Sequence, residues 1–145
     1  MWYNVSRKKG DYLSIIDYKY QHATHAQLLK CVRWCQNQLQ LRDWLIELST
    51  ELTPPKCLLT EATVLNNYGT VDVSEDKLKA VIWINLVKIK VDNQNPYSTT
   101  IHEMVHVLLM ARGNDAPEII IRVIEPMLYR LYCRENNLKI MEECL

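Results

Sequence analysis

The first long pattern of hydrophobic and polar positions runs from about residue 22 to residue 52. Apolar residues recur at helical spacings with Gln, Lys and Arg between them, and the run contains no Gly or Pro; its members are Ala26, Leu29, Val32, Leu39, Trp44, Leu45 and Leu48. We predict one long helix, or two with a break near Asn37. Two prolines in Thr53-Pro54-Pro55-Lys56 end it, because neither can continue a helix. Residues 1–20 predict a short hairpin or an extended segment.

The middle of the chain has the composition of strands and turns. We predict a strand over residues 57–65, a turn at 66–69 and a short strand at 70–73. The strongest strand candidate covers residues 79–91, because it is rich in β-branched residues and its second half alternates apolar residues with lysines.

The last third predicts two helices. Asn95 caps the first, Pro96 is its first residue, and Gly113 ends it after about Arg112. The second runs from Pro117 to about residue 137, with a kink or division at Pro126. The fold class is therefore α+β: a short, mostly antiparallel sheet packed on these two helices, with an N-terminal helical layer. The length predicts one domain, 1–145, with a helical support region at 1–57 and the sheet and two helices at 58–137.

Composition and charge narrow the class of protein. The 17 basic and 17 acidic residues cancel, so no overall positive field attracts nucleic acid. No apolar run approaches the roughly 18 residues of a membrane span, and the first residues do not form a signal peptide. Five scattered cysteines suggest no disulfide framework, which is typical of a reducing compartment. We expect a cytoplasmic protein that binds neither nucleic acid nor membrane.

The stretch with the clearest chemistry is His102-Glu103-Met104-Val105-His106, within the first of the two C-terminal helices. The two His are one helical turn apart on one face, so their imidazoles can share a tetrahedral zinc at roughly 2.0–2.1 Å. Glu103 then lies beside a zinc-bound water as its general base, and is not itself a ligand. The flanking residues are apolar, and buried His and Glu are costly unless they are paired or bind metal. The alternative is a pair of core histidines with a buried Glu partner.

This segment resembles the active-site helix of the zincin metallopeptidases. The apolar run after His106 and the acidic helix downstream are similar to the gluzincin branch, and to its small ImmA/IrrE-like and phage-encoded members. The resemblance covers roughly residues 80–130, and residues 1–57 carry no signature of the family. It implies a zincin-like fold, a Zn²⁺ cofactor and a protein or peptide substrate. It also implies that the strand before the helix, here Ala80–Val87, is a sheet edge along which the substrate adds as a strand.

A catalytic zinc usually takes a third protein ligand, and two glutamates are candidates. If the two helices are antiparallel, the residue level with His106 lies about one and a half to two turns into the second helix, which favours Glu125. Gluzincins also place their third ligand on this helix. Glu118, seven residues earlier on the same face, is the alternative, although it also suits a helix N-terminus. Tyr129 and Tyr97 are candidates for stabilising an oxyanion.

Two functions fit the pattern. The first is an intracellular zinc metallopeptidase that hydrolyses peptide bonds of a protein substrate, with His102, His106 and Glu125 as metal ligands and Glu103 as general base. The second is a zinc-stabilised protein-binding module without catalysis. A binder has no need of Glu103, whereas the enzyme requires it, so the sequence favours the enzyme.

Overall fold

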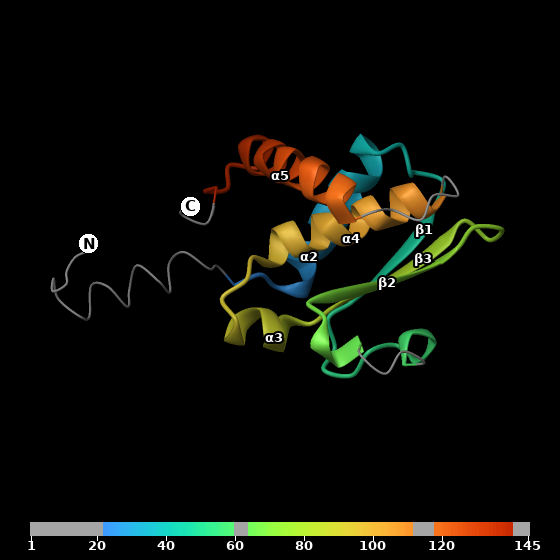
Figure 1. Cartoon of the computed structure of the whole chain (residues 1–145). Helices are drawn as coiled ribbons and strands as arrows, with labels where there is room; N and C mark the ends of the chain where they lie inside the picture. Colours follow the sequence, from blue (N-terminus) through green and yellow to red (C-terminus); the bar gives the residue numbers. More distant parts are fainter. Residues whose placement is uncertain (1–21, 60–63, 112–117, 141–145) are drawn as a thin grey trace, which may run out of the picture.

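The computed structural model describes residues 22–59, 64–111 and 118–140. Within these ranges the chain is a small α+β domain whose three longer helices lie on one side of a three-stranded sheet (Figure 1). The predictions for residues 1–20, for the helix end at Gly113 and for the helix start at Pro117 lie outside the described residues.

The sheet is mixed, and its strand order is β1-β3-β2. β1 (Leu45–Ser49) pairs in parallel with β3 (Lys79–Ile84), and β2 (Gly69–Ser74) pairs with β3 antiparallel. The prediction of a mostly antiparallel sheet is therefore wrong in detail. β3 lies in the centre with a partner on each side, so the stretch that begins at Ala80 is not a sheet edge. Among the described strands, β2 and β1 form the two edges.

The hydrogen-bond pattern of β2 fixes which of its main-chain groups face outward. The amide of Asn85 donates to the carbonyl of Tyr68 at 2.8 Å, next to the paired residues Gly69 and Ile84. In an antiparallel ladder the residues that bond to one neighbour alternate with those that face away from it. The main-chain groups that face away from β3 are therefore those of Gly69, Val71 and Val73.

Of the three longer helices, two pack against the sheet and the third packs on one of these two. α2 (His25–Gln38) begins with a capping box, in which the side chain of Thr24 and the side chain of Gln27 each bond the other residue's amide. α4 (Pro96–Ala111) begins as predicted, because Asn95 Oδ1 accepts from the amides of Tyr97 and Ser98 at 2.9 and 3.3 Å. α5 (Glu118–Glu135) contains Pro126 but is a single undivided helix.

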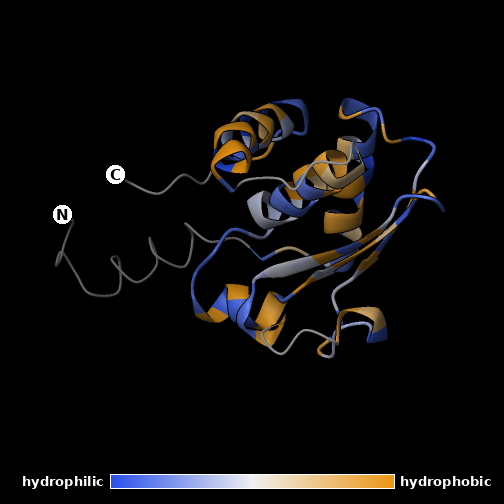
Figure 2. Cartoon of the chain, turned by 45° about the vertical axis from the view of Figure 1, so that its right-hand side comes forward, coloured by the Kyte–Doolittle hydropathy of each residue, from blue (hydrophilic) through white to orange (hydrophobic). Residues whose placement is uncertain are grey.

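α4 lies between the sheet and α5, and α2 packs beside it (Figures 1 and 2). The apolar residues Ile101, Met104, Val105 and Val107 of α4 are completely buried. They join α2, the sheet and α5 in one hydrophobic cluster. The main core thus encloses the helix that carries the two histidines, and this packing holds their backbone in place.

Three of the predicted elements are wrong. Residues 45–49 form β1 instead of continuing the N-terminal helix, because α2 ends at Gln38 and the chain turns at Gln40, where φ is 57°. The strand expected over residues 79–91 ends at Ile84, and Asn85 caps a short helix, α3 (Leu86–Val91). The strand expected over residues 57–65 is absent where the chain is described: two short 3₁₀ turns, Lys56–Leu58 and Val64–Asn66, lie there instead.

Candidate metal centre

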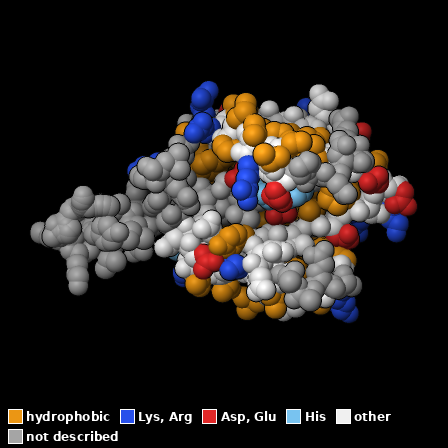
Figure 3. Space-filling model, viewed as in Figure 1, with side chains coloured by type: hydrophobic (Ala, Val, Ile, Leu, Met, Phe, Trp, Pro, Cys, Tyr) orange, Lys and Arg blue, Asp and Glu red, His pale blue; other side chains and the backbone are white. Residues whose placement is uncertain are grey.

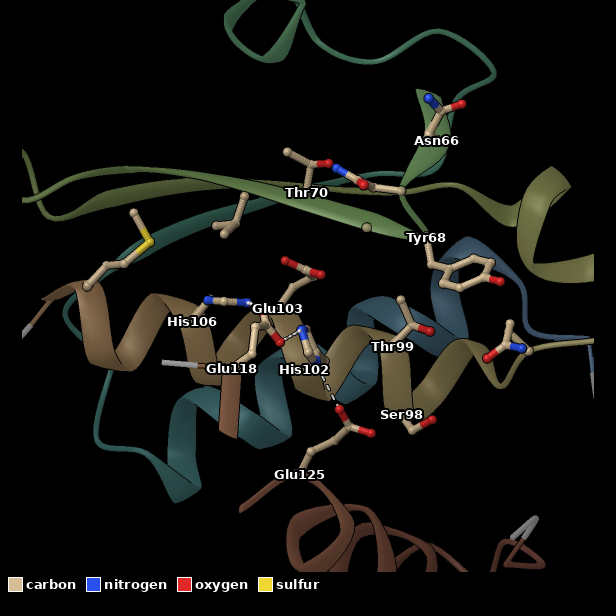
Figure 4. Close-up of a pocket in the computed structure, with 15 residues that line it drawn as sticks. Asn66, Tyr68, Thr70, Ser98, Thr99, His102, Glu103, His106, Glu118 and Glu125 are labelled. Atoms are coloured by element: carbon tan, nitrogen blue, oxygen red, sulfur yellow. Dashed lines mark hydrogen bonds and ion pairs between the residues drawn. The ribbon is translucent and has the colours of Figure 1, made fainter. Parts of the chain in front are cut away.

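His102 and His106 lie one turn apart on the face of α4 that the core leaves partly open (Figure 4). Their ring centroids are 4.9 Å apart, and the ring planes meet at 66°. The Nε2 atoms of both rings lie near the carboxylate of Glu118, at 3.4 Å for His102 and 3.1 Å for His106. Ligand atoms from these three residues all lie within 4.8 Å of one another, close enough to hold one metal ion.

The two candidate acids on α5 contact different edges of the histidine rings. Glu118, the first residue of α5, faces the Nε2 atoms, whereas Glu125 bonds the other nitrogen of His102, Nδ1, at 2.7 Å. A histidine that binds a metal through one nitrogen usually donates its other N–H to a carboxylate or carbonyl. In this arrangement Glu118 is grouped with the candidate ligands, and Glu125 is placed to orient His102. No bound metal tests the prediction that Glu125 is the third ligand, but the geometry favours the alternative, Glu118.

Glu103 lies on the same turn of α4 but points toward β2 (Figure 4). Only 6% of the residue is exposed, and none of the described residues donates a hydrogen bond to its carboxylate. The α-carbon of Gly69 in β2 lies directly against this side chain: a Cβ built on Gly69 would be 2.9 Å from both Cγ and Oε2 of Glu103. Glu103 therefore occupies a position beside the two histidines and apart from Glu118.

Burial and nearby charges shift the pKa values of these groups in different directions. Burial raises the pKa of Glu103 to about 7; the charge of His102 opposes this effect, and those of Glu118 and Glu125 add to it. Burial by itself would lower the pKa of His102, but the bond to Glu125 and the three surrounding carboxylates raise it overall. Burial and the neighbouring His102 lower the pKa of His106, which favours its neutral, ligating form.

These residues line a hollow of about 650 Å³ between the α4–α5 layer and β2. Figure 3 shows it from outside as a depression in which the imidazoles and acidic side chains are exposed, below the apolar surface of α5. One wall comes from β2 and the residues before it, and the opposite wall from α4 and the loop before it. The other lining residues are Asn66, Asn67, Tyr68, Gly69, Thr70, Val71, Gln94, Ser98, Thr99 and Met110.

The two tyrosines predicted to stabilise an oxyanion do not line this hollow. Tyr129 is buried, and its hydroxyl accepts a hydrogen bond from Asn95 Nδ2 at 2.8 Å. Tyr97 is also buried and packs against Tyr132, with ring centroids 5.8 Å apart. Both are packed aromatic residues of the core.

Sequence reasoning missed the contribution of β2 to the site. Asn66, Asn67, Tyr68 and Gly69 were predicted to form a turn, and Gly69 stood out only as a turn residue. The feature that could have indicated this contribution is the glycine at the start of a strand, because such a glycine often marks a close approach of the main chain to another group.

Comparisons with known proteins give no match: no family model, no curated sequence and no solved structure matches the chain. None of the helices in the described part of the chain is long and apolar enough to cross a membrane. The chemistry and geometry of the site are therefore what supports a function for this chain.

Proposed function

We propose that this protein is a zinc-dependent metallopeptidase whose active site is the hollow between α4 and β2. The observation that carries the proposal is the joint placement of four side chains. The Nε2 atoms of His102 and His106 converge with the carboxylate of Glu118, and Glu103 lies next to them without belonging to that group. A metal site in which a further carboxylate is kept apart from the ligands is typical of hydrolysis and unnecessary for a structural zinc.

The donor set fits zinc. Two imidazole nitrogens and one carboxylate are a ligand set of catalytic zinc sites, and they leave a position open for water or substrate. His102, His106 and Glu118 would hold the ion, and Glu125 would fix the ring of His102 through Nδ1. Zinc bound there would act as a Lewis acid that polarises a carbonyl and lowers the pKa of water.

Glu103 is the proposed general base. Its carboxylate accepts no hydrogen bond from the described residues, so its oxygens remain available to take a proton from an attacking water. The neutral carboxyl can then return that proton to the amine that leaves when the peptide bond breaks. Burial raises the pKa of Glu103 to about 7 in the metal-free site, and the positive charge of a bound zinc would lower this pKa and favour the carboxylate form that accepts a proton.

The proposed substrate is a peptide in extended conformation, held along β2. The expectation of substrate pairing with a sheet edge moves from Ala80–Val87 to β2, since β3 is paired on both sides. The outward main-chain groups of Gly69 and Val71 border the hollow, so a peptide bonded to them would lie beside Glu103. We also propose that the protein acts inside the cell, which is supported by the thiols of Cys31, Cys35 and Cys57.

Glu103→Gln separates the enzyme from a zinc-stabilised binding module. The amide keeps the size of the side chain but cannot accept a proton at neutral pH. We expect the variant to retain zinc and fold while hydrolysis falls by roughly 10²- to 10⁴-fold. The assay incubates the zinc-loaded wild type and the variant with a panel of unfolded proteins and detects new amino termini. Equal cleavage by both forms would remove Glu103 from the mechanism, and zinc binding without cleavage by the wild type would favour the binding module.

A further inference from the structure

We infer that Gly69 is a positioning residue for Glu103: its missing side chain is the space in which the proposed general base is held. β2 approaches the side chain of Glu103 on α4 closely at this residue. A Cβ at position 69 would lie 2.9 Å from Cγ, 2.9 Å from Oε2 and 3.2 Å from Cδ of Glu103. Real Cβ atoms essentially never make contacts under 3.0 Å, so a side chain at position 69 requires a shift, and the three nearest atoms all belong to Glu103.

The backbone conformation does not explain the glycine. The φ angle of Gly69 lies outside the range of +20° to +160° that favours glycine, so an L-residue could adopt it. Glycine within a strand is unfavourable, because it loses more conformational entropy on folding and contributes no packing. What the glycine does provide is room for the side chain of Glu103.

The pattern along β2 supports this reading. Side chains alternate between the two faces of a strand, so positions 69, 71 and 73 share one face. Val71 and Val73 on that face pack against the core that α4 belongs to. The same alternation would place an apolar side chain at position 69, and the glycine stands where that side chain would meet Glu103.

Packing is also the main constraint on the carboxylate. Glu103 is nearly buried, and none of the described residues donates a hydrogen bond to it, so no hydrogen bond among them fixes its orientation. The room left by Gly69 lets the side chain lie against β2, away from the group formed by the two imidazoles and Glu118 (Figure 4). A methyl group at position 69 would displace the carboxylate from β2 toward the hollow. This inference deepens the proposed function and rests on it for the role of Glu103.

A thermal double-mutant cycle tests the contact without any need for activity or metal. The variants are Gly69→Ala, Glu103→Ala and the double substitution, all measured in chelator. Gly69→Ala should lower Tm by roughly 3–10 °C in the wild-type background, since overpacking is destabilising. In the Glu103→Ala background, which removes the obstructing atoms, it should lower Tm by less than about 1 °C or raise it, because alanine is less flexible than glycine in the unfolded chain.

An equal loss of Tm in both backgrounds, or no loss in either, would overturn the inference. If Gly69→Ala does not fold, recovery of folding in the double variant supports the inference and failure to recover overturns it.

Cobalt absorption tests the positioning role, which a purely structural contact would not affect. Co²⁺ is added to the metal-free wild type and to the three variants. Gly69→Ala should change the visible absorption spectrum, because the displaced carboxylate approaches the ion, and this change should be absent in the Glu103→Ala background. A spectrum unchanged by Gly69→Ala would overturn the positioning role. If the wild type itself binds no cobalt or zinc, the proposed function fails, while the thermal cycle still decides whether Gly69 makes room for Glu103.

Discussion

At the level of single residues, the two ring nitrogens of His102 contact two different carboxylates, whose roles the sequence assigned differently from the structure. Glu118 and Glu125 lie on one face of α5, and each contacts a different nitrogen of the same imidazole. Counting residues along two antiparallel helices favoured Glu125, because it assumed that the second turn of α5 is level with His106. Glu118, the first residue of α5, lies there instead, and its Oε1 is 3.1 Å from Nε2 of His106. Which acid reaches which nitrogen depends on how the helices pack, and that information is not in the local sequence.

Glu103 should make the stability of the metal-free protein depend on pH. Its pKa in the folded protein is about 7, against 4.5 for the unperturbed group, so the folded state retains a proton that the unfolded chain releases. The free energy of unfolding therefore falls as pH rises from 4.5 through 7, by on the order of 3 kcal/mol for this group. Glu103→Gln cannot ionise and should escape this loss.

The measurement is Tm in chelator at pH 5 and pH 8 for the wild type and Glu103→Gln. The difference between the two proteins should widen in favour of the variant at pH 8. A constant difference across the two pH values would show that Glu103 ionises in the folded protein as readily as it does in water.

Thr70 has no role in the proposed reaction, and its buried hydroxyl allows a separate test of the packing around β2. Its Oγ1 atom is buried and has no hydrogen-bond partner among the described residues. Leaving a buried hydroxyl unpaired costs about 1–3 kcal/mol, and valine has nearly the same shape with good strand propensity. Thr70→Val should therefore raise Tm. Thr70→Ser, which keeps the hydroxyl but loses the methyl group, is the matched control and should lower it.

At the scale of elements, three helices end in the same way. After α2, α3 and α5 the chain passes through a left-handed residue: Gln40, Asn93 and Asn137, with φ of 57°, 54° and 57°. The amide that follows each then bonds a carbonyl five residues back, as in Leu41 to Gln36. This is the Schellman arrangement, in which glycine or asparagine usually takes the left-handed position. α2 is the exception, since it places a glutamine there.

Gln40→Gly should stabilise the protein by about 1 kcal/mol, because it removes the steric cost of a side chain in the left-handed region. Asn93→Gly is the matched control, since asparagine already tolerates this conformation, and its gain should be smaller. Chemical denaturation of both variants measures the two free energies of unfolding. A larger gain from Asn93→Gly than from Gln40→Gly would contradict this account of the helix ends.

The helix starts were easier to predict than the helix ends. Asn95 and Pro96 gave the start of α4 from local chemistry alone, and the apolar spacing gave α2, α4 and α5. The alternative of a break near Asn37 agrees with the end of α2 at Gln38, but residues 45–49 beyond it form a strand instead of a second helix. The alternation in residues 86–91 suggested a strand, but only Ile89 is buried there, and the cap at Asn85 decides for a helix. Of the site, His102, Glu103 and His106 could be predicted from spacing, whereas Gly69 and the pairing of Glu118 required the tertiary structure.

At the scale of the whole molecule, the proposed ligands join α4 to the first turn of α5. His102 and His106 come from the first helix and Glu118 from the second, so an ion held by all three would link them. Zinc at one hundred times its Kd should add about 2.7 kcal/mol to the free energy of unfolding, because it binds the folded state. Chelation should reverse this gain and lower Tm by roughly 5–10 °C. His106→Ala is the control, and its Tm should respond much less to zinc or chelator.

The zinc content and affinity of wild type, Glu118→Ala and Glu125→Ala show whether the metal centre exists and which glutamate is its ligand. We predict one zinc per wild-type chain by elemental analysis after preparation in zinc-containing, chelator-free buffer. Glu125→Ala should weaken zinc binding by roughly 10- to 100-fold, as loss of a residue that orients a ligand does. Glu118→Ala should weaken it further, because a ligand is lost. A wild type without zinc would contradict the metal centre. Loss of zinc binding in Glu125→Ala with full binding in Glu118→Ala would contradict Glu118 as a ligand. Glu125 would then be the third ligand.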